Sequence, residues 1–153
     1  MTDRTTVDLA HDALVALFQG ALPDITPTRD RAIPRLDEGQ FGFLNVVLSG
    51  QPPQVQAECM GLVEDEVEVE FVQTFNVEWI VRNVDDDARD ALFGQGLRAI
   101  ETAIRANLTL GGQALGMTIG PPVYETAVTA QSPATRAALV PVRVALRGVT
   151  MLS

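Results

Sequence analysis

The sequence predicts an α+β fold in which two helices pack on one face of a mixed, mainly antiparallel sheet with a projecting β-hairpin arm. Two periodicities predict it. Apolar residues recur at steps of three or four over residues 5–22 and 83–108, whereas apolar and polar residues alternate over residues 63–82. Side chains repeat their direction every 3.6 residues on a helix and every two on a strand. The first pattern therefore indicates helices and the second a strand.

The first helix is expected over residues 5–22. Its apolar stripe includes Leu14 and Phe18, and it follows threonine and aspartate residues that are suited to an N-cap. Pro23 lies just beyond its end. Residues 23–40 contain three prolines, so we expect an irregular connection over the surface.

The longest strand is expected over residues 63–82, after a strand at 41–50 and a shorter one at about 54–62. The apolar odd-numbered positions, which would face the core, are Val67, Val69, Phe71, Phe75, Val77, Trp79 and Val81. Twenty residues at ~3.3 Å each would span roughly 65 Å, which exceeds a compact domain of this size. Residues 54–72 are therefore a possible hairpin that projects toward a partner subunit.

The second helix is expected over residues 83–108, with aspartates at 85–87 to cap its first turn. Gly111 and Gly112 follow the helix, where a left-handed C-terminal cap requires glycine. A phosphate-binding loop would instead precede a helix and would carry the Lys-Ser/Thr of a P-loop, which this pattern lacks. We therefore predict that the two glycines are a structural joint.

The last strand is expected over residues 139–150, after a short strand, a Pro-Pro turn and a second extended segment within 115–130. One face of the last strand would present Val140, Val142, Val144 and Leu146, and the other Pro141, Arg143, Ala145 and Arg147. Because proline has no N–H to donate to a ladder, Pro141 favours an edge position or a strand end.

Length and charge exclude several classes of protein. The length of 153 residues predicts one domain over residues 1–153, and the formal net charge is −9. It has no apolar run near the ~20 residues of a bilayer span and no signal peptide, so we expect a soluble protein made in the cytoplasm. Its scattered arginines argue against sequence-independent DNA binding. Cys59 is the single cysteine, so neither a disulfide nor a zinc site is expected.

Few residues suggest chemistry. The glutamates that alternate along the central strand are Glu64, Glu66, Glu68 and Glu70. These glutamates and the aspartates at 85–87 could bind magnesium or act as an acid/base pair, but a row of glutamates at ~7 Å spacing is typical of a solvated face. His11 is interpreted as a polar boundary residue, and Trp79 and Tyr124 as packing residues in preference to a ligand pocket. We therefore expect no catalytic residue, no cofactor and no metal.

The order of elements resembles a known family. The segments "VEFVQTFNVEWIV", "DARDALFGQGLRAIETAI", "NLTLGG" and "ALVPVRVALRGV" occur in the order found in tail terminator and minor tail proteins of long-tailed bacteriophages and gene transfer agents. The resemblance covers roughly residues 5–150. It implies an α+β subunit of the virion, assembled in the cytoplasm of a bacterial host.

This resemblance implies a hexameric ring on the last ring of the tail tube. The ring would stop tube polymerisation and would join the tube to the head-side connector or stopper protein, with DNA only as passing cargo. Such a protein is not an enzyme. The four glutamates, Arg143 and Arg147 are the candidates for subunit contacts or for lining the channel; the glutamates could also face solvent or pair with the arginines.

Two rival functions stay open. One is another neck, tail-completion or tube protein, which would share ring assembly but not the capping role. The other is a small-molecule-binding or acyl-transfer domain with a pocket between helix and sheet, in which Cys59 or His11 would be the reactive group.

Overall fold

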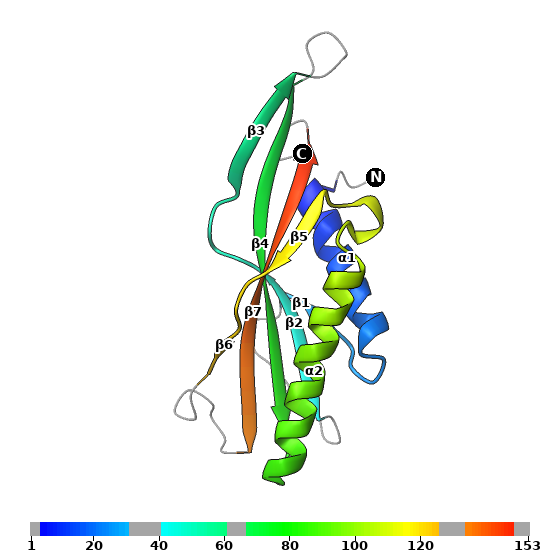
Figure 1. Cartoon of the computed structure of the whole chain (residues 1–153), viewed down its shortest axis with the longest axis vertical. Coiled ribbons are helices and arrows are strands. Elements are labelled where there is room, and N and C mark those ends of the chain that lie inside the picture. The colour runs from blue at the N-terminus through cyan, green and yellow to red at the C-terminus, as the bar shows by residue number, and fades with distance from the viewer. Residues whose placement is uncertain (1–3, 31–40, 61–66, 126–133, 149–153) are drawn as a thin grey trace.

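The computed structural model describes residues 4–30, 41–60, 67–125 and 134–148. In this part of the chain, two helices pack on one face of a seven-stranded mixed sheet (Figure 1). The predicted α+β fold class is confirmed. Most of the predicted connection at 23–40 lies outside the described residues.

The sheet is built around one long strand. The strands are β1 (Thr28–Arg29), β2 (Gly42–Leu48), β3 (Gln54–Met60), β4 (Val67–Arg82), β5 (Gly116–Ile119), β6 (Val123–Tyr124) and β7 (Thr135–Gly148). Their order is β1-β2-β4-β7-β5, with β3 also paired to β4 and β6 to β7. Only β1 and β2 run parallel; the other pairs are antiparallel. The sheet is therefore mixed and mainly antiparallel, as predicted.

Both helices begin at the caps that the sequence suggests. Helix α1 (Thr6–Ala21) starts with a capping box, in which the Asp8 N–H donates to Thr5 Oγ1 at 3.1 Å. Helix α2 (Asp86–Ala106) starts at Asp85, whose carboxylate accepts the Ala88 N–H at 3.0 Å. Neither described helix is both long and apolar enough to cross a membrane.

The core lies between the helices and one face of the sheet. Along β4 the buried side chains are Phe71, Gln73, Phe75, Val77, Trp79 and Val81, so the predicted alternation holds, with one polar member. The matching residues of β7 face them, with Val142 opposite Phe75 and Val140 opposite Val77. We call this side of the sheet the inner face and the opposite side the outer face.

Trp79 determines how closely α2 approaches the sheet. The indole is 1% exposed, and its Nε1–H donates to the Phe93 carbonyl of α2 at 3.1 Å. Gly96, one turn further along α2, lies so close that a Cβ there would come within 2.2 Å of the indole. Helix and strand therefore pack at a distance that only glycine permits at this position.

Replacing Gly96 by Ala should destabilise the fold. We expect a loss of about 1–3 kcal/mol because the added methyl forces α2 away from the sheet. In Gly94→Ala, the matched control, the new Cβ would meet only the flexible end of Arg98 at 3.2 Å. That variant should be as stable as the parent chain, or more so, because alanine favours the helix. Urea unfolding followed by circular dichroism measures both, and equal stability of the two variants would contradict this packing.

Gly111 and Gly112 lie further along the chain from the end of α2 than a C-terminal cap residue would. The helix ends at Ala106, where the side-chain amide of Asn107 donates to the Ala103 carbonyl at 2.9 Å. Leu108, which was predicted to lie within the helix, falls outside it. Gly111 and Gly112 belong to a separate short 3-10 helix, η1 (Leu110–Gly112), with φ of 64° and 97°. Both glycines adopt backbone angles that L side chains rarely take. They shape the turn from α2 to β5 and do not cap α2.

Gly111→Ala should cost about 1 kcal/mol through left-handed backbone strain alone, since a Cβ there would meet no atom within 4 Å. Gly20→Ala is the matched control, because its site at the end of α1 is equally open but has no positive φ. We expect that control to keep or raise stability. Thermal melting compares the two, and an unchanged melting temperature for Gly111→Ala would refute the strain.

Pro141 lies within an internal strand, contrary to the edge position or strand end that the sequence favours. β7 pairs with β4 along one edge and with β5 and β6 along the other. The Gly120 N–H donates to the Pro141 carbonyl at 2.8 Å, so the backbone groups of Pro141 point toward the second edge. There β5 ends at Ile119 and β6 begins at Val123. The missing N–H of Pro141 faces the gap between these short strands and leaves the β4 ladder intact.

β3 and the first part of β4 form the predicted arm, which extends beyond both helices at one end of the molecule (Figure 1). The pairing runs from Gln54 opposite Val72 to Met60 opposite Val67. β4 is 16 residues long as described, and residues 63–66 of the predicted strand lie outside the described part.

Candidate functional site: the projecting arm

The charged candidates meet on the outer face of the sheet. The register places Arg147 of β7 opposite Glu70 of β4, and Arg143 opposite Thr74. Glu68 precedes Glu70 on the same face of β4. Glu64 and Glu66, the other two members of the predicted row, lie outside the described residues.

These side chains interact within one chain. The Arg147 guanidinium is ion-paired with Glu70 Oε1 and lies 3.5 Å, through Nε, from Glu68 Oε2. Arg143 Nη2 donates to Gln54 Oε1 of β3 at 2.9 Å. The arginines therefore link β7 to β3 and β4 across the base of the arm.

The ion pairs contribute modestly to stability. The side chains of Arg147 and Glu68 are 46% and 44% exposed, and Glu70 is 28% exposed. Exposed pairs of this kind contribute about 0.2–1 kcal/mol each. At the base of the arm the described charges on this face are those of Glu68, Glu70, Arg143 and Arg147, two of each sign.

The described side chains on the inner face of the arm are apolar and partly uncovered, although the register also places Glu58 on this face, opposite Val69. Val55 of β3 is 46% exposed and Leu48 at the end of β2 is 40% exposed, although both lie in register with buried phenylalanines of β4. Val69 is only partly buried. Among the described strands, β3 pairs with β4 alone, so its other edge carries unmatched backbone groups. The arm thus offers a charged face, an apolar face and an open strand edge.

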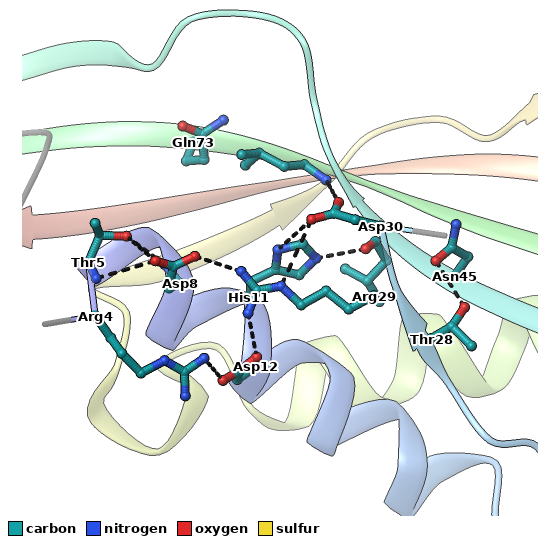
Figure 2. A network of polar contacts seen from close by, with 12 residues as sticks. Arg4, Thr5, Asp8, His11, Asp12, Thr28, Arg29, Asp30, Asn45 and Gln73 are labelled. Atoms are coloured by element: carbon teal, nitrogen blue, oxygen red, sulfur yellow. Dashed lines mark hydrogen bonds and ion pairs between the residues drawn. The ribbon is translucent and has the colours of Figure 1, made fainter. Parts of the chain in front are cut away.

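A second polar cluster fixes α1 to β1 (Figure 2). Arg29 of β1 donates to Asp12 at 2.8 Å and to Asp8 at 2.6 Å, which lie one helical turn apart on α1. Arg4 pairs with the second oxygen of Asp12. We call these four residues the Arg29 cluster. The sequence interpretation missed it; the aspartates at i and i+4 were the available signal, but their cation comes from another element.

His11 is a core residue and not a boundary residue. It is 1% exposed, its Nε2 lies 2.7 Å from the Val46 carbonyl of β2, and its ring contacts Phe75 with centroids 5.0 Å apart. Nδ1 faces the Asp30 carboxylate at 3.9 Å (Figure 2). The interpretation of His11 as a boundary residue was wrong because a strand carbonyl inside the core provides a hydrogen-bond partner for the imidazole ring.

The cluster changes the acid–base behaviour of its members. A hydrogen bond from Thr5, helped by Arg29, lowers the pKa of Asp8 below its ordinary 3.8. Partial burial opposes the shift at Asp12, but hydrogen bonds from Arg4 and Arg29 outweigh it and lower that pKa as well. Carboxyls with a lowered folded-state pKa stabilise the fold above their unfolded pKa, and this contribution is lost as pH falls through the folded value.

Arg29→Ala should therefore have a pH-dependent cost. We expect a loss of about 1 kcal/mol near pH 7, which shrinks as the pH falls below about 4 because Asp8 and Asp12 become protonated in both states. Arg105→Ala, which removes a 72% exposed arginine paired with Glu101, serves as the control and should cost less. Urea unfolding from pH 7 to pH 3 measures both. A cost for Arg29→Ala that stays constant over this range would exclude the ionic role.

One carboxylate on the outer face is held in an unfavourable environment. Burial raises the pKa of Glu78 above its ordinary 4.5; a hydrogen bond with Asn45 opposes the shift, and the nearby Glu125 adds to it.

The described residues contain no group of three or more His, Cys, Asp and Glu side chains placed to hold a metal ion. Cys59 lies in the arm opposite Glu68, whereas His11 lies between α1 and β2.

Comparisons with known proteins find similarity in structure only. No protein family matches the sequence, and no curated protein matches it either. A chain from the virion of a native gene transfer agent particle superposes with a TM-score of 0.49 and 18% identity, over 88% of this chain and 84% of that one. A chain from a contractile injection system, solved as the PVC sheath/tube terminator in the extended state, has a TM-score of 0.45 and 17% identity. That match covers 95% of this chain and 58% of the other, so this chain spans little more than half its length.

Proposed function

We propose that this chain is a structural virion protein of the tail terminator type, which forms a ring on the tail tube of a phage-like particle or gene transfer agent. The projecting arm carries the proposal, together with the sequence pattern that resembles this family. The two structural matches are too distant to add to it.

The arm has the properties of a subunit contact. β7 pairs with β4 only as far as Val69, so the described end of the arm has two strands, and the outer edge of β3 is open. A two-stranded end is marginally stable in water without further packing, and an open strand edge favours pairing with another chain. Val55 and Leu48 leave apolar area exposed along the inner face. A neighbouring copy would cover this area and the edge together. If the arm of each copy packs on a different patch of the next, the contact is heterologous, and such contacts close into rings when the rotation permits.

Six copies form this ring. It stops polymerisation of the tube protein and contacts the head-side connector or stopper, and DNA passes through it only as cargo. Assembly takes place in the bacterial cytoplasm, and the product is part of the virion. The subunit needs no cofactor for this role.

The outer face of the arm favours a structural contact over a negative channel lining. Glu68 and Glu70 are paired with Arg147 of the same chain, and Arg143 adds a further positive charge. A lining that repels phosphate requires excess negative charge. At the base of the arm the described charges on this face balance, which supports a role in holding the arm against the body.

The acyl-transfer alternative receives less support. His11 is buried, and one ring nitrogen is already held by the Val46 carbonyl. A general base must come within hydrogen-bond reach of the proton that it removes, which this position prevents. Another neck or tube protein remains the stronger rival, because it would use the same arm.

Val55→Asp tests the proposal without disturbing the core, since Val55 is 46% exposed on the arm. We expect the parent chain to form hexameric rings with the tube protein and to shorten the tubes, as seen by native mass spectrometry and electron microscopy. Val55→Asp should lose both properties while it keeps its circular dichroism spectrum, because a charge cannot be buried in an apolar contact.

Val84→Asp is the matched control, because Val84 is 91% exposed and lies between the end of β4 and the start of α2, away from the arm. It should assemble normally. A parent chain that stays monomeric with the tube protein at every concentration would exclude the proposed ring. Rings that form without halting tube growth would favour the tube or neck alternative.

A further inference from the structure

Two open strand edges lie on opposite sides of the β4–β7 pair, in the half of the molecule that carries the arm (Figure 1). Among the described strands, β3 pairs only with β4 and β5 pairs only with β7. β3 has seven residues and β5 has four, whereas the edge strands β1 and β6 have two each. Short edge strands are one way in which proteins avoid pairing with other chains. β3 and β5 are therefore the edges that can best accept a further strand.

These two edges carry little of the protection that prevents pairing. β5 contains no charged residue, and the only charged residue of β3 is Glu58. Neither strand contains an arginine or a proline. A bulge between Val55 and Ala57 interrupts the start of β3, but residues 57–60 keep a regular register with β4. Charges, prolines and bulges protect natural strand edges, so residues 57–60 and the whole of β5 are open to another strand.

The register shows which backbone groups of β3 are unmatched. The Thr74 carbonyl accepts a hydrogen bond from the residue that follows β2, so the even-numbered residues of β4 point toward β2 and β3. Ala57 and Cys59 stand opposite even-numbered residues of β4, so their backbone groups bond to that strand. Glu58 and Met60 alternate with them. Their N–H and C=O groups therefore face the open edge.

The same reasoning applies to β5. The Gly120 N–H donates to the Pro141 carbonyl, so the odd-numbered residues of β7 point toward β5. Thr118 stands opposite one of these residues, and its backbone groups bond to β7. Met117 and Ile119 lie on either side of Thr118 in the strand. Their N–H and C=O groups therefore face the second open edge.

The two edges match in the face of the sheet to which they belong. Met117 and Ile119 stand opposite buried valines of β7, on the inner face. Glu58 stands opposite Val69, which is also on the inner face. Residues that are directly opposite in an antiparallel pair lie on the same side of a sheet. If the edges of two copies paired, the inner faces and their helices would therefore stay on one side.

Strand direction favours a link between copies in the same orientation. β3 and β7 run antiparallel to β4, and β5 runs antiparallel to β7, so β3 and β5 of one chain run in opposite directions. When rotation about an axis along the strands places a second copy beside the first, its β3 meets β5 as an antiparallel neighbour. The edges are staggered, since β5 is level with residues 72–75 of β4 and β3 with residues 67–72. The strand tilt of a closed sheet provides such a stagger.

We propose that β5 of one copy pairs antiparallel with β3 of the next, through the backbone groups that these edges leave unmatched. The inference rests on the proposed ring and names its contact. Val55, 46% exposed, and Ile119, partly buried, share the inner face, so the pairing also covers apolar area. Because the two edges differ, the contact is heterologous and each copy uses both edges.

Thr118→Cys tests the pairing together with the native Cys59. The register places both positions on the outer face, opposite Arg143 and Glu68. Within one chain they are three strand spacings apart, roughly 14 Å, which is too far for a disulfide. Across a β5–β3 contact, directly opposite Cα atoms lie about 4.5–5.5 Å apart, within disulfide range. Oxidation of the assembled variant should link copies into a ladder that extends beyond the dimer on a non-reducing gel.

A second variant covers the other register that these edges allow, in which Thr118 faces Ala57. It combines Thr118→Cys and Ala57→Cys with Cys59→Ser. The controls are two chains with one cysteine each, the parent and Thr118→Cys with Cys59→Ser, and neither should link copies. A disulfide dimer of the parent would indicate that two β3 edges pair about a two-fold axis and would overturn the assignment. Absence of a ladder in both two-cysteine variants would overturn it as well.

Glu58→Pro tests the backbone bonds themselves. It removes an N–H at the open edge of β3, whereas the bonds to β4 are made by the residues on either side. We expect ring formation with the tube protein to fall about tenfold or more, because proline cannot donate to an added strand. Glu58→Ala is the matched control; it keeps the N–H and should assemble as the parent does. Sedimentation over a range of concentrations measures the association, and circular dichroism confirms that both variants are folded.

The outcomes separate this contact from the ring itself. If the parent forms rings and Glu58→Pro forms them equally well, the edge assignment fails and the proposed function stands. If the parent forms no rings with the tube protein, the proposed function fails, and the contact fails with it.

Discussion

The structure depends on the length of β4 and on its pairing along both edges. β2 and β3 follow one another along one edge, and β7 runs along the other from Arg82 to Val69. Every second side chain of the body section is buried under the helices. Because the strand is longer than the helices that cover it, the same alternation that builds the core also builds the arm. One end of β4 thus belongs to the projecting hairpin, and the rest of the strand belongs to the compact core.

Close packing at one point fixes the helix layer on this strand. Trp79 fills the space under α2, and Gly96 provides the clearance. The other helix, α1, is held by different contacts, since the Arg29 cluster joins its first turns to β1 and His11 lies within hydrogen-bond distance of the Val46 carbonyl. One helix is positioned by close packing and the other largely by polar contacts. Neither helix covers the outer face of the sheet or the arm.

Local pattern predicted the elements but not their partners. The alternation along β4, the two helices and the projecting hairpin follow from the spacing of apolar residues and from strand length, which the chain encodes locally. The position of Pro141 was predicted wrongly because an internal strand tolerates proline only where no neighbouring strand needs its N–H. That condition depends on where β5 ends and β6 begins, in a different part of the chain. His11 was misjudged for the same reason, since its hydrogen-bond partner lies on a strand 35 positions away.

The candidate site was only partly accessible from the sequence. The row of glutamates was visible, but its pairing with Arg147 needs the register between β4 and β7, whose members are 77 positions apart. A groove lined by Arg98 and Tyr124 lies between α2 and the turn that joins β5 to β6, and neither segment carries a motif of its own. Surfaces that are assembled from distant segments have no local signature.

The aromatic residues provide two built-in optical reporters. The chain has one tryptophan and one tyrosine, and the structure places them in opposite environments. The indole of Trp79 is 1% exposed, so its emission responds to loss of the core. The phenol of Tyr124 is 56% exposed at the groove, where covering by another chain would alter its absorbance. Folding and association of the unlabelled protein can therefore be followed separately in one cuvette.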